Sequence, residues 1–520
     1  MSKAAIGLCC GAAFLGLTGQ DGALAQGKPV APAASSFPSI GHTDPRYESY
    51  NLDLIAITGM AAKPKMELAR ATPQGENDAK VATVMSGVQL ERPLDLGNAR
   101  LRKLAAGLAP AYLRTSGTSA NSVYFQDDDK PLLTQPPAGF ATVMNRAQWK
   151  GVLDFARAVD AKLLVSFAIN DAVRDASGTW TPRMAKPWAD YTRRIGGSFY
   201  AAELFNEPNL PSYGGAPKGY NPAWFARDQM AFRAFTAKAL PTMKIVGPGD
   251  VVTANYPLPG NVPGDSLMNV EHRPRFDIIS YHFYPAVALR CAPARSPVGT
   301  TPDDALTEAW LAKTDKSIED HKALRDRYEP GAPIWNTETA GAACSGAAWD
   351  ATFIDSFRYV DQLGRLARQG ASAVFHQTLV GGNYGLLDPV TFQPRPNYWA
   401  ALLWKRFMGS TVLDAGNGAD GLHLYAHCTP HKRGAVTMLA INLNSASRSI
   451  ELQTGGQLYA LTSSELQSAT VDLNGRELAL GKSDALPRLD PLTVKSGSVT
   501  LAPHSINFVV MAAAQNGACT

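Results

Sequence analysis

The stretch Tyr200-Ala201-Ala202-Glu203-Leu204-Phe205-Asn206-Glu207-Pro208 decides the fold. It is a short, mostly apolar run that ends in polar residues and a proline, as expected of a buried strand followed by a loop. Similar runs lie before and after it, separated by stretches with helical spacing. The predicted strands are Tyr50–Ala56, Ala111–Arg114, Leu163–Ala168, Tyr200–Phe205, Lys244–Val246, Phe276–His282, Ile334–Thr337 and Ala373–Thr378. Eight such units predict an α/β protein with a (β/α)8 TIM barrel.

The apolar pattern changes along the chain. Trp149, Val152, Leu153 and Ala156 follow the i, i+3, i+4, i+7 spacing of an amphipathic helix. After about residue 409 the helical spacing gives way to short strand-like runs, with turn residues such as Asn474-Gly475 between them. We therefore expect the (β/α)8 barrel over residues 47–408 and a C-terminal β-sandwich domain over residues 409–520.

Residues 1–25 have the features of a signal peptide. Lys3 gives a positive start, residues 4–17 are apolar but too few to span a bilayer, and Ala23-Leu24-Ala25 fits a cleavage site. A membrane anchor or a buried helix is the alternative. We expect an exported protein, periplasmic or extracellular, without membrane attachment after cleavage. Residues 26–46 then form a linker or N-terminal segment.

Charge and cysteine content restrict the function further. A net charge of +4 over 520 residues is too small to indicate nucleic-acid binding. Four cysteines remain after the signal segment, and an even number in an exported chain permits disulfides. They are Cys291, Cys344, Cys428 and Cys519, and they lack the C-x-x-C spacing of zinc sites. The oligomeric state stays open.

Two predicted strands end in a carboxylate. The fourth ends in Asn206-Glu207-Pro208, and the seventh ends in Asn336-Thr337-Glu338. Active sites of β/α barrels lie at the C-terminal ends of the strands, and strands four and seven face each other across the barrel mouth. Glycoside hydrolysis needs two carboxyl groups, one on each side of the scissile bond. The pair therefore predicts a glycosidase site at Glu207 and Glu338.

These motifs resemble the large barrel clan of retaining glycosidases and, within it, glycoside hydrolase family 79, the heparanase and β-glucuronidase family. The resemblance runs from about Tyr47 to the C-terminus. It is carried by LAPAYLRTSGTSANSVYF (108–125), AELFNEPNLPSYGG (202–215), DIISYHFYP (277–285), PIWNTETAGAACSG (333–346), GGNYGLLD (381–388) and PNYWAALLWKRFMGS (396–410).

The resemblance implies a role for each matching residue. Glu207 matches the proton donor, Glu338 the nucleophile, and Asn206 the amide that binds the sugar 2-hydroxyl. Tyr384 matches a contact to the uronic carboxylate, with Gly382 in the same loop, while Asp53 and Thr118 match residues lining the pocket for the non-reducing sugar. His282 and Tyr284 match an H-x-Y pair whose tyrosine orients the nucleophile. Packing roles are the alternatives for Tyr384, His282, Tyr284 and Asp53. Glu203 is interpreted as structural, and Gln377 as either structural or sugar-binding.

The family also implies a disulfide between Cys428 and Cys519, an N-terminal segment that adds to the sandwich, and chemistry without a metal or organic cofactor. The expected substrate carries terminal β-linked glucuronic acid, in glucuronides or glycosaminoglycan-like chains. One alternative is an endo-acting heparanase or hyaluronidase-like enzyme, which the loop 255–261 disfavours because it lacks basic residues. The other is a non-catalytic carbohydrate-binding barrel. A second disulfide, between Cys291 and Cys344, stays open against two free thiols.

Overall fold

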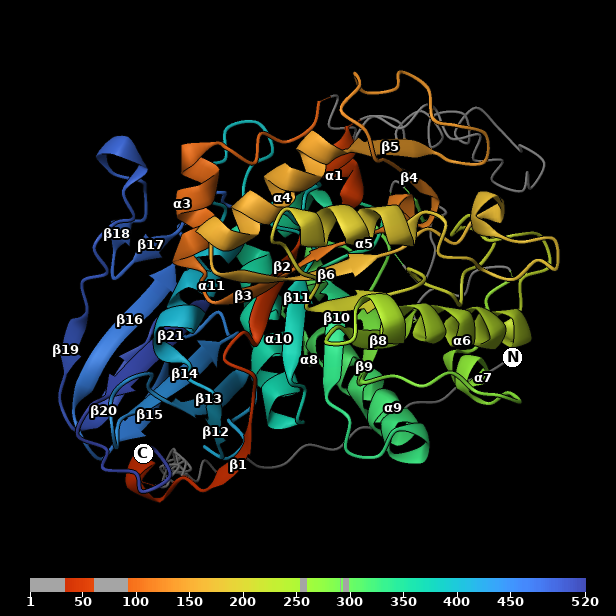
Figure 1. Cartoon of the computed structure of the whole chain (residues 1–520). Helices are drawn as coiled ribbons and strands as arrows, with labels where there is room; N and C mark the ends of the chain where they lie inside the picture. Colours follow the sequence, from red (N-terminus) through yellow and green to blue (C-terminus); the bar gives the residue numbers. More distant parts are fainter. Residues whose placement is uncertain (1–32, 60–91, 253–259, 290, 293–298) are drawn as a thin grey trace, which may run out of the picture. The chain divides into compact units, whose positions relative to one another are not determined.

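The computed structural model describes residues 33–59, 92–252, 260–289, 291–292 and 299–520 (Figure 1). The expected signal peptide and its cleavage site lie outside these residues. Within the described residues, no helix has both the length and the apolar character needed to cross a membrane.

The predicted TIM barrel is confirmed. Eight described strands run parallel and close on themselves in the order β10-β11-β2-β3-β6-β7-β8-β9 (Figure 1). They are β2 (Glu48–Asn51), β3 (Ala111–Thr115), β6 (Ala161–Ser166), β7 (Ala201–Glu203), β8 (Lys244–Val251), β9 (Ile278–Phe283), β10 (Ile334–Thr339) and β11 (Ala373–His376). A short parallel pair, β4 (Val123–Gln126) and β5 (Thr142–Asn145), lies in the connection after β3.

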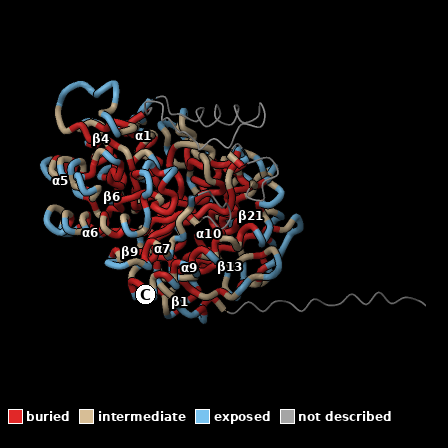
Figure 2. The backbone as a smooth tube through the Cα atoms, turned by 90° about the vertical axis from the view of Figure 1, so that its right-hand side faces the viewer, coloured by how far each residue is buried: buried red, intermediate tan, exposed pale blue. Residues whose placement is uncertain are grey.

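Helices connect the barrel strands. The described ones are α1 (Leu54–Thr58), α3 (Ala99–Gly107), α4 (Arg146–Ala158), α5 (Ala185–Arg194), α6 (Pro222–Ala239), α7 (Gly264–Met268), α8 (Glu308–Leu311), α9 (Lys313–Tyr328), α10 (Phe353–Arg368) and α11 (Pro396–Phe407). The start of α4 shows why local sequence suffices here. Asn145 and Gln148 form a reciprocal capping box, and Trp149, Val152 and Ala156 bury the expected face. Figure 2 shows the result, with exposed outer sides on α5 and α6 around a buried interior.

The first predicted strand is placed too late in the sequence. The apolar run from Tyr50 to Ala56 was expected to be one strand, but β2 ends at Asn51 and helix α1 begins at Leu54. The carbonyl of Asp53 accepts a hydrogen bond from the backbone N–H of Ala56, which turns the chain into the helix. Apolar runs of this length suit a strand and a short buried helix equally, so composition could not separate them.

The barrel interior has two layers of different chemistry. The first layer is apolar and aromatic, and it consists of Tyr112, Leu164, Ala201, Val246, Ile278, Trp335, Ala373 and Phe375. Two residues further along β3, β6 and β7, the inward positions carry Arg114, Ser166 and Glu203, all buried. Side chains alternate along a strand, so each strand supplies one residue to each layer. The polar layer lies nearer the C-terminal ends of the strands.

The predicted C-terminal β region is also present. Its main sheet is antiparallel, with the strand order β1-β12-β13-β14-β21-β16-β17-β18 and with β19 beside β16. The strands are β1 (Ser39–His42), β12 (Thr411–Leu413), β13 (Leu422–Cys428), β14 (Val436–Asn442), β16 (Gly456–Thr462), β17 (Asp472–Leu473), β18 (Arg476–Glu477), β19 (Leu492–Val494) and β21 (Ser505–Met511). A ribbon of β15 (Arg448–Leu452) and β20 (Gly497–Leu501) packs on this sheet through a shared apolar core, which gives the second layer of the sandwich.

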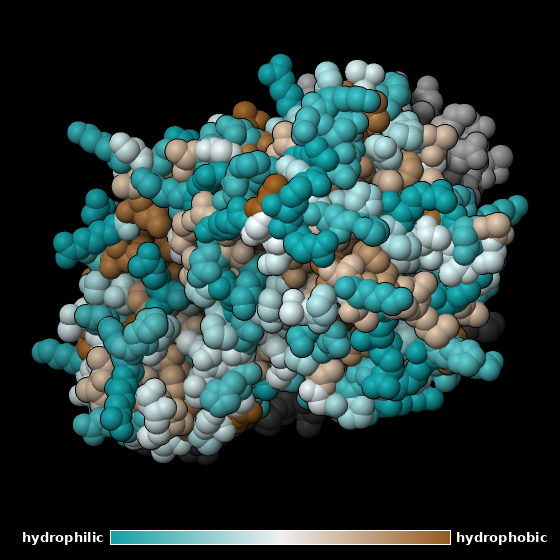
Figure 3. Space-filling model, viewed as in Figure 1, coloured by the Kyte–Doolittle hydropathy of each residue, from teal (hydrophilic) through white to brown (hydrophobic). Residues whose placement is uncertain are grey.

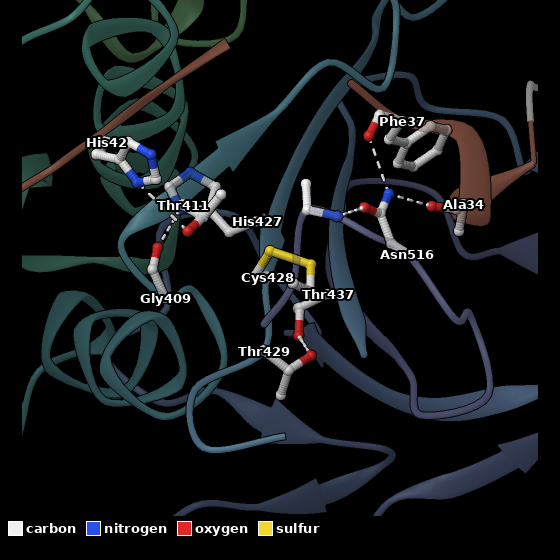
Figure 4. The surroundings of a disulfide bond; sticks show 12 residues. Ala34, Phe37, His42, Gly409, Thr411, His427, Cys428, Thr429, Thr437 and Asn516 are labelled. Atoms are coloured by element: carbon white, nitrogen blue, oxygen red, sulfur yellow. Dashed lines mark hydrogen bonds between the residues drawn. A yellow bond between two sulfur atoms is a disulfide. The ribbon is translucent and has the colours of Figure 1, made fainter. Parts of the chain in front are cut away.

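The segment before the barrel belongs to this sheet. Strand β1 pairs with β12, so residues near position 40 join strands that follow the barrel in sequence. At the far end of the chain, Asn516 donates hydrogen bonds to the carbonyls of Ala34 and Phe37 (Figure 4). The same figure shows the disulfide between Cys428 and Cys519, which ties the C-terminal tail to the end of β13. Both chain ends of the described unit are therefore held on the sandwich.

The surface seen in Figure 3 is mainly hydrophilic, with hydrophobic side chains gathered in small groups. Scattered exposed apolar residues are normal on folded proteins and need no special account.

Candidate active site

The two predicted glutamates meet at one end of the barrel. Glu207 follows β7, and Glu338 lies in β10. An oxygen of each carboxylate and a ring nitrogen of His282 all lie within 4.8 Å of one another. Retaining glycosidases hold their two carboxyl groups about 5–5.5 Å apart, whereas inverting ones need about 6.5–9.5 Å. The nearest oxygens of Glu207 and Glu338 thus lie closer together than the carboxyl groups of inverting enzymes.

A bulge in β10 aims Glu338 into the barrel. Trp335 points inward and pairs with Ser280, so strict alternation would send the side chain of Glu338 outward. The register between β10 and β9 shifts between Asn336 and Glu338, and Glu338 then pairs with His282. Bulges next to active sites commonly redirect one side chain in this way.

Both oxygens of Glu338 are already hydrogen-bonded. The hydroxyl of Tyr284 donates to Oε1 over 2.6 Å, and Nη1 of Arg114 donates to Oε2 over 2.8 Å. Burial raises the pKa of Glu338, but the charges of His282 and Arg114 and these two hydrogen bonds outweigh it, so the pKa lies below its ordinary value. This carboxyl group is held in the ionised form that a nucleophile needs.

Glu207 has the opposite environment. Its backbone has a φ of 59°, in the left-handed region that non-glycine residues rarely adopt, and its side chain is 18% exposed. His282 Nδ1 lies 3.1 Å from its Oε1. Burial raises the pKa of Glu207 and the charge of Glu338 adds to this, while His282 and Arg114 oppose it. The net shift is upward. Two carboxyl groups with opposite pKa shifts suit the roles of acid and nucleophile.

Arg114 lies at the centre of the site, and the sequence analysis did not identify it. Its side chain is fully buried on β3 and bonds to Glu338, to Oε1 of Glu203 over 2.6 Å, and to Oδ1 of Asn206 over 2.7 Å. Glu203 also accepts hydrogen bonds from the hydroxyls of Ser116 and Ser166. The only available signal was a lone arginine inside an otherwise apolar strand. Glu203, which we interpreted as structural, is an ion-pair partner of this arginine.

We expect Arg114→Met to damage stability and activity together. The methionine removes the cation between two buried carboxylates, and breaking a buried ion pair costs about 3–5 kcal/mol. Thermal unfolding and the hydrolysis rate should both fall, relative to wild type and to Arg476→Met on the exposed strand β18. An unchanged melting temperature with an unchanged rate would show that the network around Arg114 holds nothing in place.

The side chain of Asn206 is oriented by the same network. Its Oδ1 accepts from Arg114 Nη2 over 2.7 Å and from Ser116 Oγ over 3.3 Å. None of the described residues bonds to its Nδ2, so the amide N–H groups are left to donate to a ligand. This orientation suits a contact to a sugar hydroxyl.

Asp53, Gln377 and Tyr384 form a second group beside Glu338. Nε2 of Gln377 donates to both oxygens of Asp53, over 2.8 and 2.9 Å, while its Oε1 accepts from Asn51. Burial and the nearby charge of Glu338 raise the pKa of Asp53 to about 7, although the Gln377 bond opposes this. Burial, with Asp53 and Glu338, also raises the pKa of the Tyr384 hydroxyl. Asp53 and Tyr384 thus lie close to the proposed nucleophile.

The loop around Tyr384 depends on Gly382. The φ of Gly382 is 61°, and a side chain there would meet the carbonyl of Ser345 and the ring of Tyr384 at 2.9 Å. Nη1 of Arg395 donates to the carbonyls of Gly382, Asn383 and Gly385 and closes the loop from the other side. Gly382 therefore has a structural reason to be glycine, whatever its contact with a sugar.

Other expectations have different outcomes. Thr118 begins the 3₁₀ helix Thr118–Ser122, and its side chain is exposed, with none of the described residues bonded to it. The loop 255–261, used to disfavour endo action, lies mostly outside the described residues.

A disulfide joins Cys291 and Cys344, which settles the open choice against two free thiols and links the loops after β9 and β10. Glu207, His282 and Glu338 could approach a cation, yet protein donors already occupy both oxygens of Glu338.

Comparisons with known proteins find heparanases and glucuronidases among the similar proteins. No family model matches the chain. Baicalin-β-D-glucuronidase of Scutellaria baicalensis is 33% identical over 46% of this chain and 46% of its own length. The chain thus spans about half the length of the first plant relatives that it matches. Heparanase of Bos taurus is 27% identical over 82% of this chain and 86% of its own length.

A solved 4-O-α-L-rhamnosyl-β-D-glucuronidase of Fusarium oxysporum 12S covers 92% of this chain and 99% of its own, with a TM-score of 0.64 and 14% identity. At 14% identity, this structural similarity supports a shared fold and nothing further. The sequence matches show that the chain resembles glycoside hydrolase family 79, the heparanase and β-glucuronidase family.

Proposed function

We propose that this protein is a retaining glycoside hydrolase that removes terminal β-linked glucuronic acid. Glu338 attacks the anomeric carbon while Glu207 gives its proton to the leaving oxygen. Glu207 then takes a proton from a water molecule that attacks the anomeric carbon. The bond to Glu338 breaks, and the sugar leaves with its original configuration. No step in this sequence requires a metal or an organic cofactor.

One observation carries the proposal. The two carboxyl groups stand within 4.8 Å of each other, and their pKa values are displaced in opposite directions. A sugar-binding protein has no need of a partly buried acid next to a buried carboxylate, because each costs desolvation energy that binding alone does not offset. Catalysis accounts for both. The relatives named glucuronidase and heparanase support a glucuronide as the substrate.

The proposed sugar contacts come from the family resemblance, and the geometry of the site supports some of them. Asn206 offers its free N–H groups to the 2-hydroxyl, and Tyr284 holds the nucleophile. Tyr384 contacts the uronic carboxylate. Asp53, with its pKa at about 7, can accept a hydrogen bond from a sugar hydroxyl or donate one to it. Thr118 is the least supported of the proposed contacts because its side chain is exposed.

Export from the cytoplasm remains part of the proposal. The two disulfides support it, because such bonds persist mainly in oxidising compartments.

We also propose that residues 47–408 form the catalytic domain and that the sandwich is built from residues 409–520 together with part of the segment 26–46.

The experiment compares aryl β-glucuronides with aryl β-glucosides. We expect wild type to prefer the glucuronide, and Tyr384→Phe to lose about tenfold or more of its kcat/KM on the glucuronide, with a smaller loss on the glucoside, because one hydrogen bond to a charged group is removed. Product sizing on a glucuronic-acid polymer separates terminal from internal cleavage. Equal losses on both substrates would leave Tyr384 with a packing role, and a wild type inactive on every glucuronide would refute the proposed function.

A further inference from the structure

Two side chains outside the loop 381–385 hold the backbone of that loop in place. Nε2 of His376, the last residue of β11, lies 2.7 Å from the carbonyl oxygen of Tyr384. Nη1 of Arg395 lies 2.9, 2.9 and 3.2 Å from three more carbonyl oxygens, those of Gly382, Asn383 and Gly385. Four successive carbonyl groups are thus bonded to these two side chains, and one of them belongs to the tyrosine proposed to contact the uronic carboxylate.

His376 is buried and neutral, which decides where its proton lies. Burial and the charge of Arg358 lower the pKa of His376 to about 3, although the bond to the Tyr384 carbonyl opposes this. A neutral imidazole has one N–H group, and only a proton on Nε2 makes the contact with a carbonyl oxygen attractive. His376 therefore donates to Tyr384. None of the described residues bonds to its other nitrogen, Nδ1.

The loop also rests on the segment that follows Glu338. The backbone N–H of Asn383 donates to the carbonyl of Ser345 over 2.8 Å, and its Nδ2 donates to the carbonyl of Gly346 over 3.2 Å. A side chain on Gly346 would meet the backbone nitrogen of Tyr384 at 2.8 Å and its ring at 2.9 Å. Contacts from outside the loop therefore set the position of Tyr384 relative to the proposed nucleophile.

We propose that His376 and Arg395 are positioning residues for the recognition of the uronic acid. By holding the carbonyl groups of the loop, they place the Tyr384 hydroxyl where it can donate to the carboxylate of the bound sugar. Their effect on the substrate passes through Tyr384, because each spends its hydrogen bonds on the loop. This inference rests on the proposed function, since it concerns the sugar that the same site selects.

The first test replaces the donor. His376→Phe keeps a ring of similar size but leaves the carbonyl of Tyr384 without its hydrogen bond. We expect kcat/KM to fall about tenfold on an aryl β-glucuronide and less than about threefold on the matching β-glucoside, because only the glucuronide uses the contact to Tyr384. His376→Gln, whose amide can still donate to this carbonyl, should retain most of the preference for the glucuronide.

His427 provides a matched control in the sandwich (Figure 4). It is equally buried, and burial lowers its pKa to about 4. Its Nδ1 lies 2.5 Å from the carbonyl oxygen of Gly409, and none of the described residues bonds to its Nε2. Each of the two imidazoles also packs edge-on against one aromatic ring. His427→Phe should therefore lower the melting temperature much as His376→Phe does, yet leave the ratio of the two kcat/KM values unchanged.

A double variant tests whether His376 acts through Tyr384. Tyr384→Phe already lacks the contact to the uronic carboxylate, so adding His376→Phe should reduce the remaining glucuronide preference by less than about twofold. A further loss of about tenfold would show an independent effect and overturn the inference. Arg395→Met alters a side chain that is 15% exposed and should also lower the preference, so it supplies the test if His376→Phe does not fold.

The outcomes separate this inference from the proposed function. If wild type prefers the glucuronide but folded His376→Phe and Arg395→Met lose equally on both substrates, or on neither, the positioning role is refuted while the glucuronidase remains. If wild type hydrolyses no glucuronide, the proposed function itself fails.

Discussion

Glu338→Gln should abolish turnover, with kcat reduced on the order of 10⁴-fold or more, as expected when an enzyme loses its nucleophile. The amide nearly matches the carboxylate in shape, and Tyr284 can still donate to its oxygen, so the fold should persist. What disappears is the negative charge that attacks the anomeric carbon. Steady-state rates on an aryl β-glucuronide measure the loss.

A matched substitution separates chemistry from folding. Glu477→Gln changes an exposed glutamate on β18 and should leave the rate unchanged. Circular dichroism and thermal unfolding should show that Glu338→Gln is folded. A folded Glu338→Gln enzyme with a rate near that of wild type would exclude Glu338 as the nucleophile.

Glu207→Gln should give a loss that depends on the leaving group. General acid catalysis contributes about 10²–10⁴-fold, and the need for it grows as the leaving alcohol becomes less acidic. The variant should therefore fail on alkyl glucuronides yet still form the glycosyl intermediate from dinitrophenyl glucuronide. Azide should then restore turnover, because it attacks without a general base. A uniform loss across leaving groups, without rescue by azide, would contradict the role of Glu207.

The pH dependence should follow from the same two groups. Activity needs Glu338 ionised and Glu207 protonated. The pKa of Glu338 is lowered, so the acid limb should lie at low pH, and the pKa of Glu207 is raised, so kcat/KM should fall only as the pH rises through that higher value. In Glu207→Gln the alkaline limb should disappear for activated substrates.

Local sequence patterns were enough to predict most of the helices and strands of the barrel. All eight barrel strands were predicted because each is a short apolar run ended by polar or turn residues, and α4 because its cap and its apolar face agree. The first strand was misplaced because Leu54 to Ile57 suits a buried helix as well as a strand. The pairing of β1 with β12 joins residues some 370 positions apart, and only the family resemblance pointed to it.

The sequence predicted where the two glutamates lie, because their motifs end two opposite strands. The structure brings Glu207 and Glu338 together at one end of the barrel. Arg114 was not predicted, because its importance depends on partners far away in the sequence, Glu203 and Asn206 at the end of β7 and Glu338 in β10. The inward direction of Glu338 depends on a register shift between β9 and β10, which no local pattern encodes. Tertiary contacts decide both features.

The most direct test of the central claim is to identify the residue that becomes covalently attached to the sugar. A 2-deoxy-2-fluoro-β-glucuronyl fluoride slows hydrolysis of the glycosyl-enzyme, so mass spectrometry of the digested protein can locate the label. We expect one added sugar per chain, on the peptide that contains Glu338, and no label in Glu338→Gln. A label on Glu207, or an enzyme that turns over β-glucuronides with inversion and never acquires a label, would contradict the account.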